Sequence, residues 1–176
     1  MGRGNCAVSA RAVQVSANRL AALRQALSEP DQPYAALRVL DRLLDEAIGH
    51  KLFTALLYRP QHGMAERLYS SRPDVFPSHG TKNLADAPTM ARVLTSGAPY
   101  VATEVGDIER DFPDHEKIFA LGCGSILNVP VRRQGTVLGQ VNLLHVAGHL
   151  RESHLSAVET MAEIVAPAFL SILNRG

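Results

Sequence analysis

The chain has 176 residues, of which 46% are hydrophobic and 20% are charged, and this composition predicts one globular domain with a substantial core. Its formal net charge is +1 and no basic run exceeds Arg132-Arg133, so we expect no nucleic-acid partner, which would need a concentrated basic surface. No apolar run reaches the ~20 residues that span a bilayer, no signal-peptide pattern opens the chain, and two distant cysteines form no disulfide framework. We therefore expect a cytoplasmic protein without membrane contact.

Hydrophobic periodicity and turn residues divide the chain into helices and strands. Residues 1–15 are small and polar and are predicted to be disordered, which leaves 16–176 as the single domain. Leucine spacing predicts two N-terminal helices, and an apolar stripe predicts a long C-terminal helix over 152–174. After these helices we predict a strand at 51–58, its hairpin partner at 66–71 and a long loop at 72–86. A short helix closed by Gly97, a short strand at 99–103 and a loop at 106–115 follow. A short helix ending at Gly122 then leads into strands at 125–132 and 136–146. Segregated helices and strands of this kind indicate an α+β fold with an antiparallel sheet of about five strands.

The final helix is more apolar than a surface helix needs to be. One apolar stripe suffices for packing on a sheet. Further apolar residues lie beyond that stripe, at Met161, Ile164, Ala168, Leu170 and Leu173. This surplus predicts packing against a second chain or against the N-terminal helix.

The last two strands can be sorted into faces because side chains alternate along a strand. A three-residue loop at Arg133–Gly135 predicts that Val131 pairs with Val137 and Asn128 with Gln140. In this register one face is apolar apart from Ser125 and includes Val137. We expect the terminal helices to cover that face.

The opposite face of this hairpin is mixed and is the first candidate for a site. It presents Asn128, Gln140 and Asn142 among apolar residues such as Leu138. An apolar surface with a few amides is typical of a small-molecule pocket. The same amides could instead hydrogen-bond to loops that cover the face.

The stretch from Pro33 to Asn174 resembles a GAF domain. The resemblance is carried by "ALRVLDRLLDEAIG", "FTALLYR", "ERLYSS", "VLTSGAPYVATEV" and, above all, "GSILNVPVRRQGTVLGQVNLLH" followed by a helix. It implies a central antiparallel sheet of five to six strands, N- and C-terminal helices on one face, and a pocket roofed by loops and short helices on the other. It also implies a sensory module that binds a small organic ligand of undetermined identity, forms a homodimer through its terminal helices, and passes its output to a signalling partner.

The signatures of two well-known ligand classes are incomplete. Cyclic-nucleotide-binding members often carry Asn-Lys, and here Leu143 follows Asn142. A bilin attachment site usually has Cys followed by His, whereas Gly124 follows Cys123. The resemblance therefore predicts neither ligand.

Cys123 supports an alternative function of a different class. "FPDH", Phe112–His115, is similar to a stretch of the free methionine sulfoxide reductases, whose reactive cysteine follows where this chain has "EKIFAL". In a redox enzyme of that type, His115 could activate the Cys123 thiol. A small buried residue at a glycine-flanked bend explains the same cysteine, and a ligand-free dimerisation module is a third possibility.

The remaining candidates lie around the long loop. Lys82, with Arg67, His79 and neighbouring serines, could meet an anion or a carboxylate, and a solvated loop would explain them equally well. The candidate ligand-binding residues are Tyr69, Ser71, Lys82, His115, Cys123, Ser125, Asn128, Gln140 and Asn142. We assign no catalytic residue, and we predict no metal site because the histidines at 145, 149 and 154 fall on a strand end, a loop and a helix start.

Overall fold

The computed structural model describes residues 13–174, so the predicted disordered segment at 1–15 falls mostly outside the described residues, as does Cys6. The helices are α1 (Ala17–Ala26), α2 (Tyr34–Ala47), α3 (Pro88–Ser96), α4 (Val105–Asp111), α5 (His115–Ala120) and α6 (Leu155–Leu173). The strands are β1 (Leu52–Arg59), β2 (Met64–Ser70), β3 (Thr81–Asn83), β4 (Tyr100–Ala102), β5 (Ser125–Arg133) and β6 (Thr136–His145). Short 3-10 turns lie at Pro60–His62, Leu84–Asp86 and Glu152–His154.

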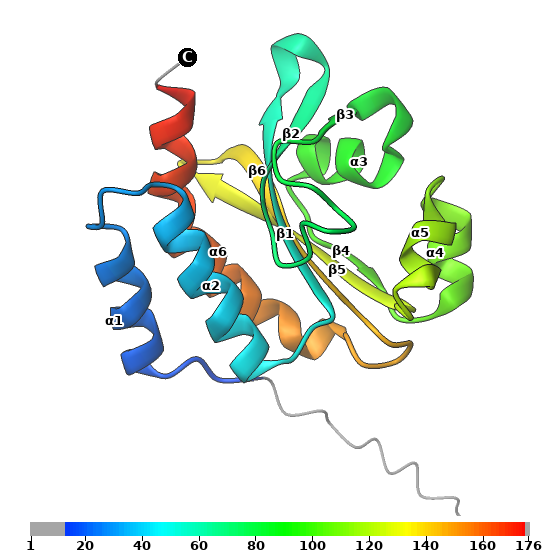
Figure 1. The fold of residues 1–176 in the computed structure, drawn as a ribbon, viewed down its shortest axis with the longest axis horizontal. Helices are drawn as coiled ribbons and strands as arrows, with labels where there is room; N and C mark the ends of the chain where they lie inside the picture. Colours follow the sequence, from blue (N-terminus) through cyan, green and yellow to red (C-terminus); the bar gives the residue numbers. More distant parts are fainter. Residues whose placement is uncertain (1–12, 175–176) are drawn as a thin grey trace, which may run out of the picture.

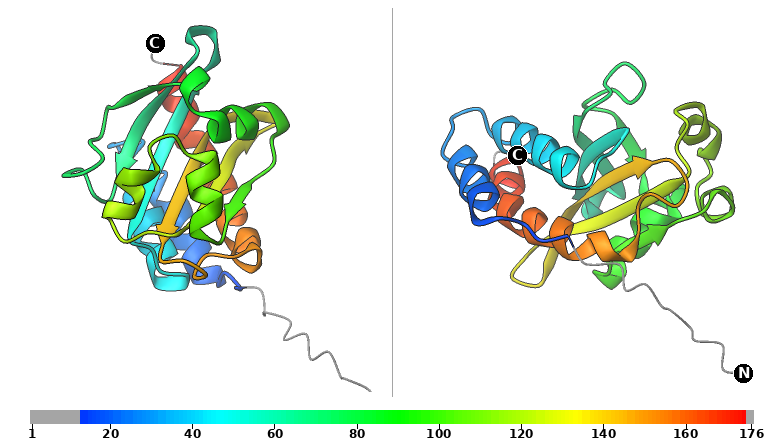
Figure 2. Two further views of the ribbon diagram at one scale, coloured as in Figure 1. Left: turned by 90° about the vertical axis from the view of Figure 1, so that its right-hand side faces the viewer. Right: turned by 90° about the horizontal axis from the view of Figure 1, so that it is seen from below.

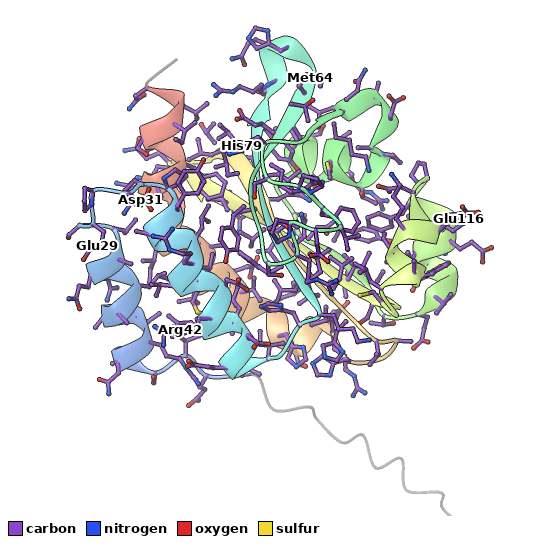
Figure 3. The ribbon with its side chains drawn as sticks, viewed as in Figure 1. Glu29, Asp31, Arg42, Met64, His79 and Glu116 are labelled. Atoms are coloured by element: carbon purple, nitrogen blue, oxygen red, sulfur yellow. The ribbon has the colours of Figure 1, made fainter. Side chains whose placement is uncertain are left out.

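The six strands form one antiparallel sheet in the order β3-β2-β1-β6-β5-β4. The terminal helices α1, α2 and α6 lie on one side of it, and α3, α4 and α5 lie on the other (Figure 1). Seen from below, the sheet separates the two groups (Figure 2). Charged side chains such as Arg42 on α2 and Glu29 between α1 and α2 lie on the outer surface (Figure 3). The α+β fold predicted from the sequence is confirmed.

Part of the surplus apolar surface of α6 packs inside this molecule. The helix contacts β5, β6, α1 and α2, and the surplus residues Met161 and Ala168 are buried. By length and composition alone, Glu152–Leu173 could also cross a membrane, but here it is a core helix that contacts β5, β6, α1 and α2. Ile164, Leu170 and Leu173 stay partly exposed at its margin.

The predicted register of the last hairpin is wrong by two residues. Val131 pairs with Gly139, not with Val137, and Asn128 pairs with Asn142. A shift of two residues keeps every side chain on its face. At a distance from the turn, the prediction that Asn128 and Asn142 share one face is therefore correct.

The difference arises at the turn itself. Gln134 and Gly135 both have positive φ, 49° and 79°, which is typical of a two-residue type I′ turn rather than a three-residue loop. Arg132 therefore pairs with Val137, and Leu138 is the extra residue of a β-bulge. The bulge places Leu138 in the core beside the helices and turns Val137 to the opposite face, the reverse of the prediction.

The roof contains more regular structure than predicted. The stretch predicted as a loop at 106–115 contains α4, and the end of the loop predicted at 72–86 forms β3. Gly106, Asp107 and the Phe112-Pro113 pair resemble turn residues, but full burial of Ile108 stabilises the short α4. Tertiary packing therefore decided the structure of these segments.

His50, between α2 and β1, forms a buried ion pair. Its Nε2 lies 2.9 Å from Asp41 Oδ1, and the side chains of His50 and Asp41 are only 6% and 16% exposed. The Tyr69 hydroxyl donates to Asp41 Oδ2 at 2.8 Å. Burial by itself lowers the pKa of His50, but the hydrogen bonds and charge of Asp41 outweigh it and raise that pKa.

We expect His50→Gln to destabilise the protein more at low pH than at high pH. A raised folded-state pKa means that the folded state holds the proton more tightly, so the contribution is complete below the ordinary value of ~6.5 and is lost as pH rises through the folded-state pKa. At pH 5 the loss should be about 1–3 kcal/mol, measured by urea unfolding at pH 5 and pH 8. Asp41→Asn should show the same trend, and a loss independent of pH would contradict the assignment.

Candidate functional site

A cavity of about 60 Å³ lies against the face of the sheet opposite the terminal helices. Strand alternation supplies its floor, because every second residue of a strand points to the same side. The apolar floor residues are Leu52, Leu56, Ile126 and Leu144, and the polar ones are Thr54, Asn128, Gln140 and Asn142. Three neighbouring strands, β1, β6 and β5, therefore build the floor.

The polar floor residues form a row across these strands. Thr54 pairs with Asn142 across β1 and β6, and Asn142 pairs with Asn128 across β6 and β5. Asn142 Nδ2 donates to Thr54 Oγ1 at 2.9 Å, and Gln140 Nε2 donates to Asn142 Oδ1. The Tyr58 hydroxyl in turn donates to Gln140 Oε1. Four side chains are thus joined in one buried hydrogen-bonded chain, the amide chain.

Asn128 differs from the other amides of the floor. It is 2% exposed and lines the cavity. Within residues 13–174, its side-chain amide has no hydrogen-bond partner, whereas Gln140 and Asn142 are both engaged in the amide chain. Buried amides are nearly always hydrogen-bonded, so an amide free at a cavity wall is available to a ligand.

The roof is built from four apolar side chains on separate segments. They are Phe76 in the loop after β2, Met90 on α3, Phe112 after α4, and Ile118 on α5. Sequence reasoning missed all four as site residues, and it missed Thr54 and Leu56 on β1. Only the alternation of β1 could have signalled the last two, since nothing local shows which loop folds over a sheet.

Charged side chains gather beside this roof. Lys82 Nζ of β3 lies 2.8 Å from Asp114 Oδ2, ahead of α5, and this ion pair joins the two sides of the roof. Arg67 of β2 also lines the cavity, donates from Nη1 to the Pro77 carbonyl at 2.8 Å, and lies 5.4 Å from the centre of the Phe76 ring. Burial lowers the pKa of Arg67, and the charge of Asp114 acts in the opposite direction.

The structure brings four of the nine predicted residues together at the cavity, Lys82, Asn128, Gln140 and Asn142. Tyr69 lies on the opposite face of the sheet from Arg67. Tyr69 pairs with Ala55 and Arg67 pairs with Leu56, so Leu68 between them is the extra residue of a β-bulge. The bulge turns Tyr69 to the face that carries the terminal helices. Tyr69 instead bonds to Asp41.

Three further predicted residues do not line the cavity and make structural contacts instead. Ser71 Oγ accepts from the Phe53 backbone N–H at 2.9 Å. Ser125 Oγ donates to the Val146 carbonyl at 2.7 Å and holds the loop after β6. The ring of His115 has its Nδ1 2.9 Å from the Phe112 carbonyl and packs on Phe119.

Cys123 is buried beneath α4 and α5 and does not line the cavity. It is 4% exposed, and burial raises the pKa of its thiol, with Lys51 acting in the opposite direction. A nucleophilic cysteine needs a lowered pKa and access to substrate. Gly124 beside it allows close approach of the chain, since a Cβ there would lie 2.9 Å from the Ala147 nitrogen.

The three C-terminal histidines do come together, without forming a metal site. The rings of His145 and His149 stack with centroids 3.7 Å apart, and His154 lies 6.2 Å from His149. In the part of the chain that the structure describes, no group of three His, Cys, Asp or Glu side chains is placed to hold a metal ion.

Comparison with known proteins identifies the family to which this fold belongs. A family model of the GAF domain matches residues 35–169. The chain is similar to the GAF domain of a phosphoenolpyruvate-protein phosphotransferase from Coxiella burnetii, with 15% identity, a TM-score of 0.73, and coverage of 90% of this chain and 95% of that one. It is also similar to a free methionine-R-sulfoxide reductase from Neisseria meningitidis in complex with its substrate, with 13% identity, a TM-score of 0.66, and coverage of 95% and 99%.

A third similar structure comprises residues 122 to 287 of a methyl-accepting chemotaxis protein, with 14% identity, a TM-score of 0.66, and coverage of 88% of this chain and 96% of that one. A search of curated proteins found no match. At these identities the structures establish the fold alone, and the family model spans more than half of the sequence. The chain belongs to the GAF domain family.

Proposed function

We propose that this chain binds a small organic molecule in the cavity on the β1-β6-β5 floor and acts as a sensory module. GAF domains are generally small-molecule-binding sensory modules, which supports this reading of the cavity. The observation that carries the proposal is the free amide of Asn128, which is 2% exposed at the cavity wall. A ligand with a donor or acceptor at that point would complete its hydrogen bonding.

Chain assembly and output form the second part of the proposal. Partly exposed apolar residues at the end of α6, among them Leu170, Ile172 and Leu173, favour a homodimer through the terminal helices. The ligand and the dimer surface would then lie on opposite faces of one sheet. Output would pass to a signalling partner in the cytoplasm. The similarity to part of a methyl-accepting chemotaxis protein supports the signalling role.

We expect Asn128→Ala to weaken ligand binding about five- to tenfold, because one hydrogen bond from a buried amide is worth about 1–1.5 kcal/mol. The ligand-free variant should unfold within about 1 kcal/mol of the wild type, because no described side chain loses a partner. The measurement is a thermal-shift screen of small metabolites on the wild type, followed by calorimetric titration of the hits on both proteins.

Cys123→Ala is the matched control, since it alters a buried residue outside the cavity. It should leave the affinity of each hit unchanged. Hits that bind Asn128→Ala as tightly as the wild type, or a screen in which no metabolite stabilises the wild type, would contradict the proposal. Loss of binding in Cys123→Ala would instead favour the cysteine-dependent alternative.

A further inference from the structure

We propose that the ligand of this cavity is a small carboxylate whose anionic group is held by Arg67 and Lys82. This inference rests on the proposed function and names the chemical class of its ligand. Three of the side chains that line the cavity are charged, Arg67, Lys82 and Asp114. Two are positive and one is negative, so the lining carries one excess positive charge.

The positive charge is only partly matched within the protein. Asp114 Oδ2 accepts from Lys82 Nζ at 2.8 Å, and no ion pair joins Arg67 to a carboxylate anywhere in residues 13–174. Arg67 is half-buried, and its buried Nε has no hydrogen-bond partner within the same range; the same holds for the buried Oδ1 of Asp114. A charged donor that is buried without a partner favours an anion beside it.

The position of Arg67 is fixed by other contacts, so that it offers a preformed site. Its Nη1 is engaged by the Pro77 carbonyl, and its guanidinium lies over the Phe76 ring. Gly80 permits this placement, because a Cβ there would lie 2.8 Å from Arg67 Nη1. Burial lowers the pKa of Arg67, and the charge of Asp114 offsets this lowering only in part.

The size of the cavity limits the ligand. About 60 Å³ of the cavity is open to the centres of water molecules, and about 10–15 Å³ of such space holds one of them. The cavity therefore has room for a few water molecules, or for a short carboxylate, while the roof stays in place.

The test compares straight-chain carboxylates from acetate to hexanoate with the primary amides of the same length, at constant ionic strength and by calorimetric titration of the full chain. We expect each carboxylate to bind about tenfold more tightly than its amide, because charge-assisted hydrogen bonds are roughly twice as strong as neutral ones. Equal affinities for the two series would overturn the inference.

Three variants separate the charges of this cluster. Lys82→Gln should remove most of the preference for carboxylates, and Asp114→Asn should raise carboxylate affinity severalfold by deleting the opposing charge. Glu66→Gln is the matched control, because the Arg59–Glu66 pair is 25% and 30% exposed, as against 26% and 33% for Lys82–Asp114, and does not line the cavity. It should leave both affinities unchanged.

The outcomes distinguish this inference from the proposed function. If amides bind as well as carboxylates and both need Asn128, the cavity is a ligand site and the carboxylate class is wrong. If Asp114→Asn weakens carboxylate binding, Asp114 itself contacts the ligand and a simple anion is wrong. If neither series binds and the metabolite screen is also empty, both the inference and the proposed function fail.

Discussion

Replacement of Gly139 by alanine should lower the free energy of unfolding by about 3–5 kcal/mol, the largest effect that we expect of any single methyl group in this chain. A Cβ at Gly139 would lie 2.0 Å from the Leu56 carbonyl oxygen and 2.9 Å from Phe169 Cε1. The first neighbour is backbone in the central β1-β6 pair, where Gly139 pairs with Leu57. Neither partner can move away without separating the strands or displacing α6.

Urea unfolding at neutral pH measures this loss. Gly106→Ala is the matched control, since Gly106 lies in α4 and a Cβ there would meet nothing within 4 Å. That change should be neutral or stabilising by up to about 1 kcal/mol, because alanine favours helix over glycine. A loss below about 1 kcal/mol for Gly139→Ala would show that the contact between β6 and β1 is looser than described here.

Replacement of Gln140 by leucine should cost about 2–3 kcal/mol of stability, although the two side chains are similar in size. Gln140 is fully buried in the amide chain, where it donates to Asn142 Oδ1 and accepts from the Tyr58 hydroxyl. Leucine leaves the Asn142 oxygen without its donor. The Tyr58 hydroxyl retains only the Met90 carbonyl, at 3.2 Å.

A double-mutant cycle with Tyr58→Phe checks this reading. Both losses involve one hydrogen bond, so the double variant should be about 1 kcal/mol more stable than the sum of the two single changes predicts. Asn128→Ala on the same face gives the contrast, because the Asn128 amide has no described partner to lose. Additive losses would show that the Tyr58–Gln140 hydrogen bond contributes nothing.

These two amide substitutions together test a division of roles on one surface. The amide chain, Tyr58–Gln140–Asn142–Thr54, satisfies its own polar groups and gives the floor a fixed shape. Asn128, beside it on β5, has its hydrogen-bonding capacity free. The stability of the protein should therefore depend on the amide chain, and its affinity for the ligand on Asn128.

Much of the floor could be predicted from the sequence because strand alternation is local. The face shared by Asn128, Gln140 and Asn142 depends only on their even spacing, so it survived an error of two residues in the register. The same logic could not foresee the two β-bulges. One bulge reverses the predicted faces of Val137 and Leu138, and the other turns Tyr69 to the face that carries the terminal helices. A bulge depends on the turn and on the partner strand, and no local pattern encodes it.

By itself, the sequence determined the α+β fold, the alternation that builds the cavity floor and the apolar stripes of the terminal helices, because each depends on residues a few positions apart. Only the tertiary structure decided which residues close the cavity. Arg67, Phe76, Lys82 and Asp114 come from separate segments of the chain, and they meet only when the roof folds over the sheet. It also decided that Cys123 lies in a buried cluster and that Met161 and Ala168, from the surplus apolar surface of α6, are buried, since burial is a property of the whole packed chain.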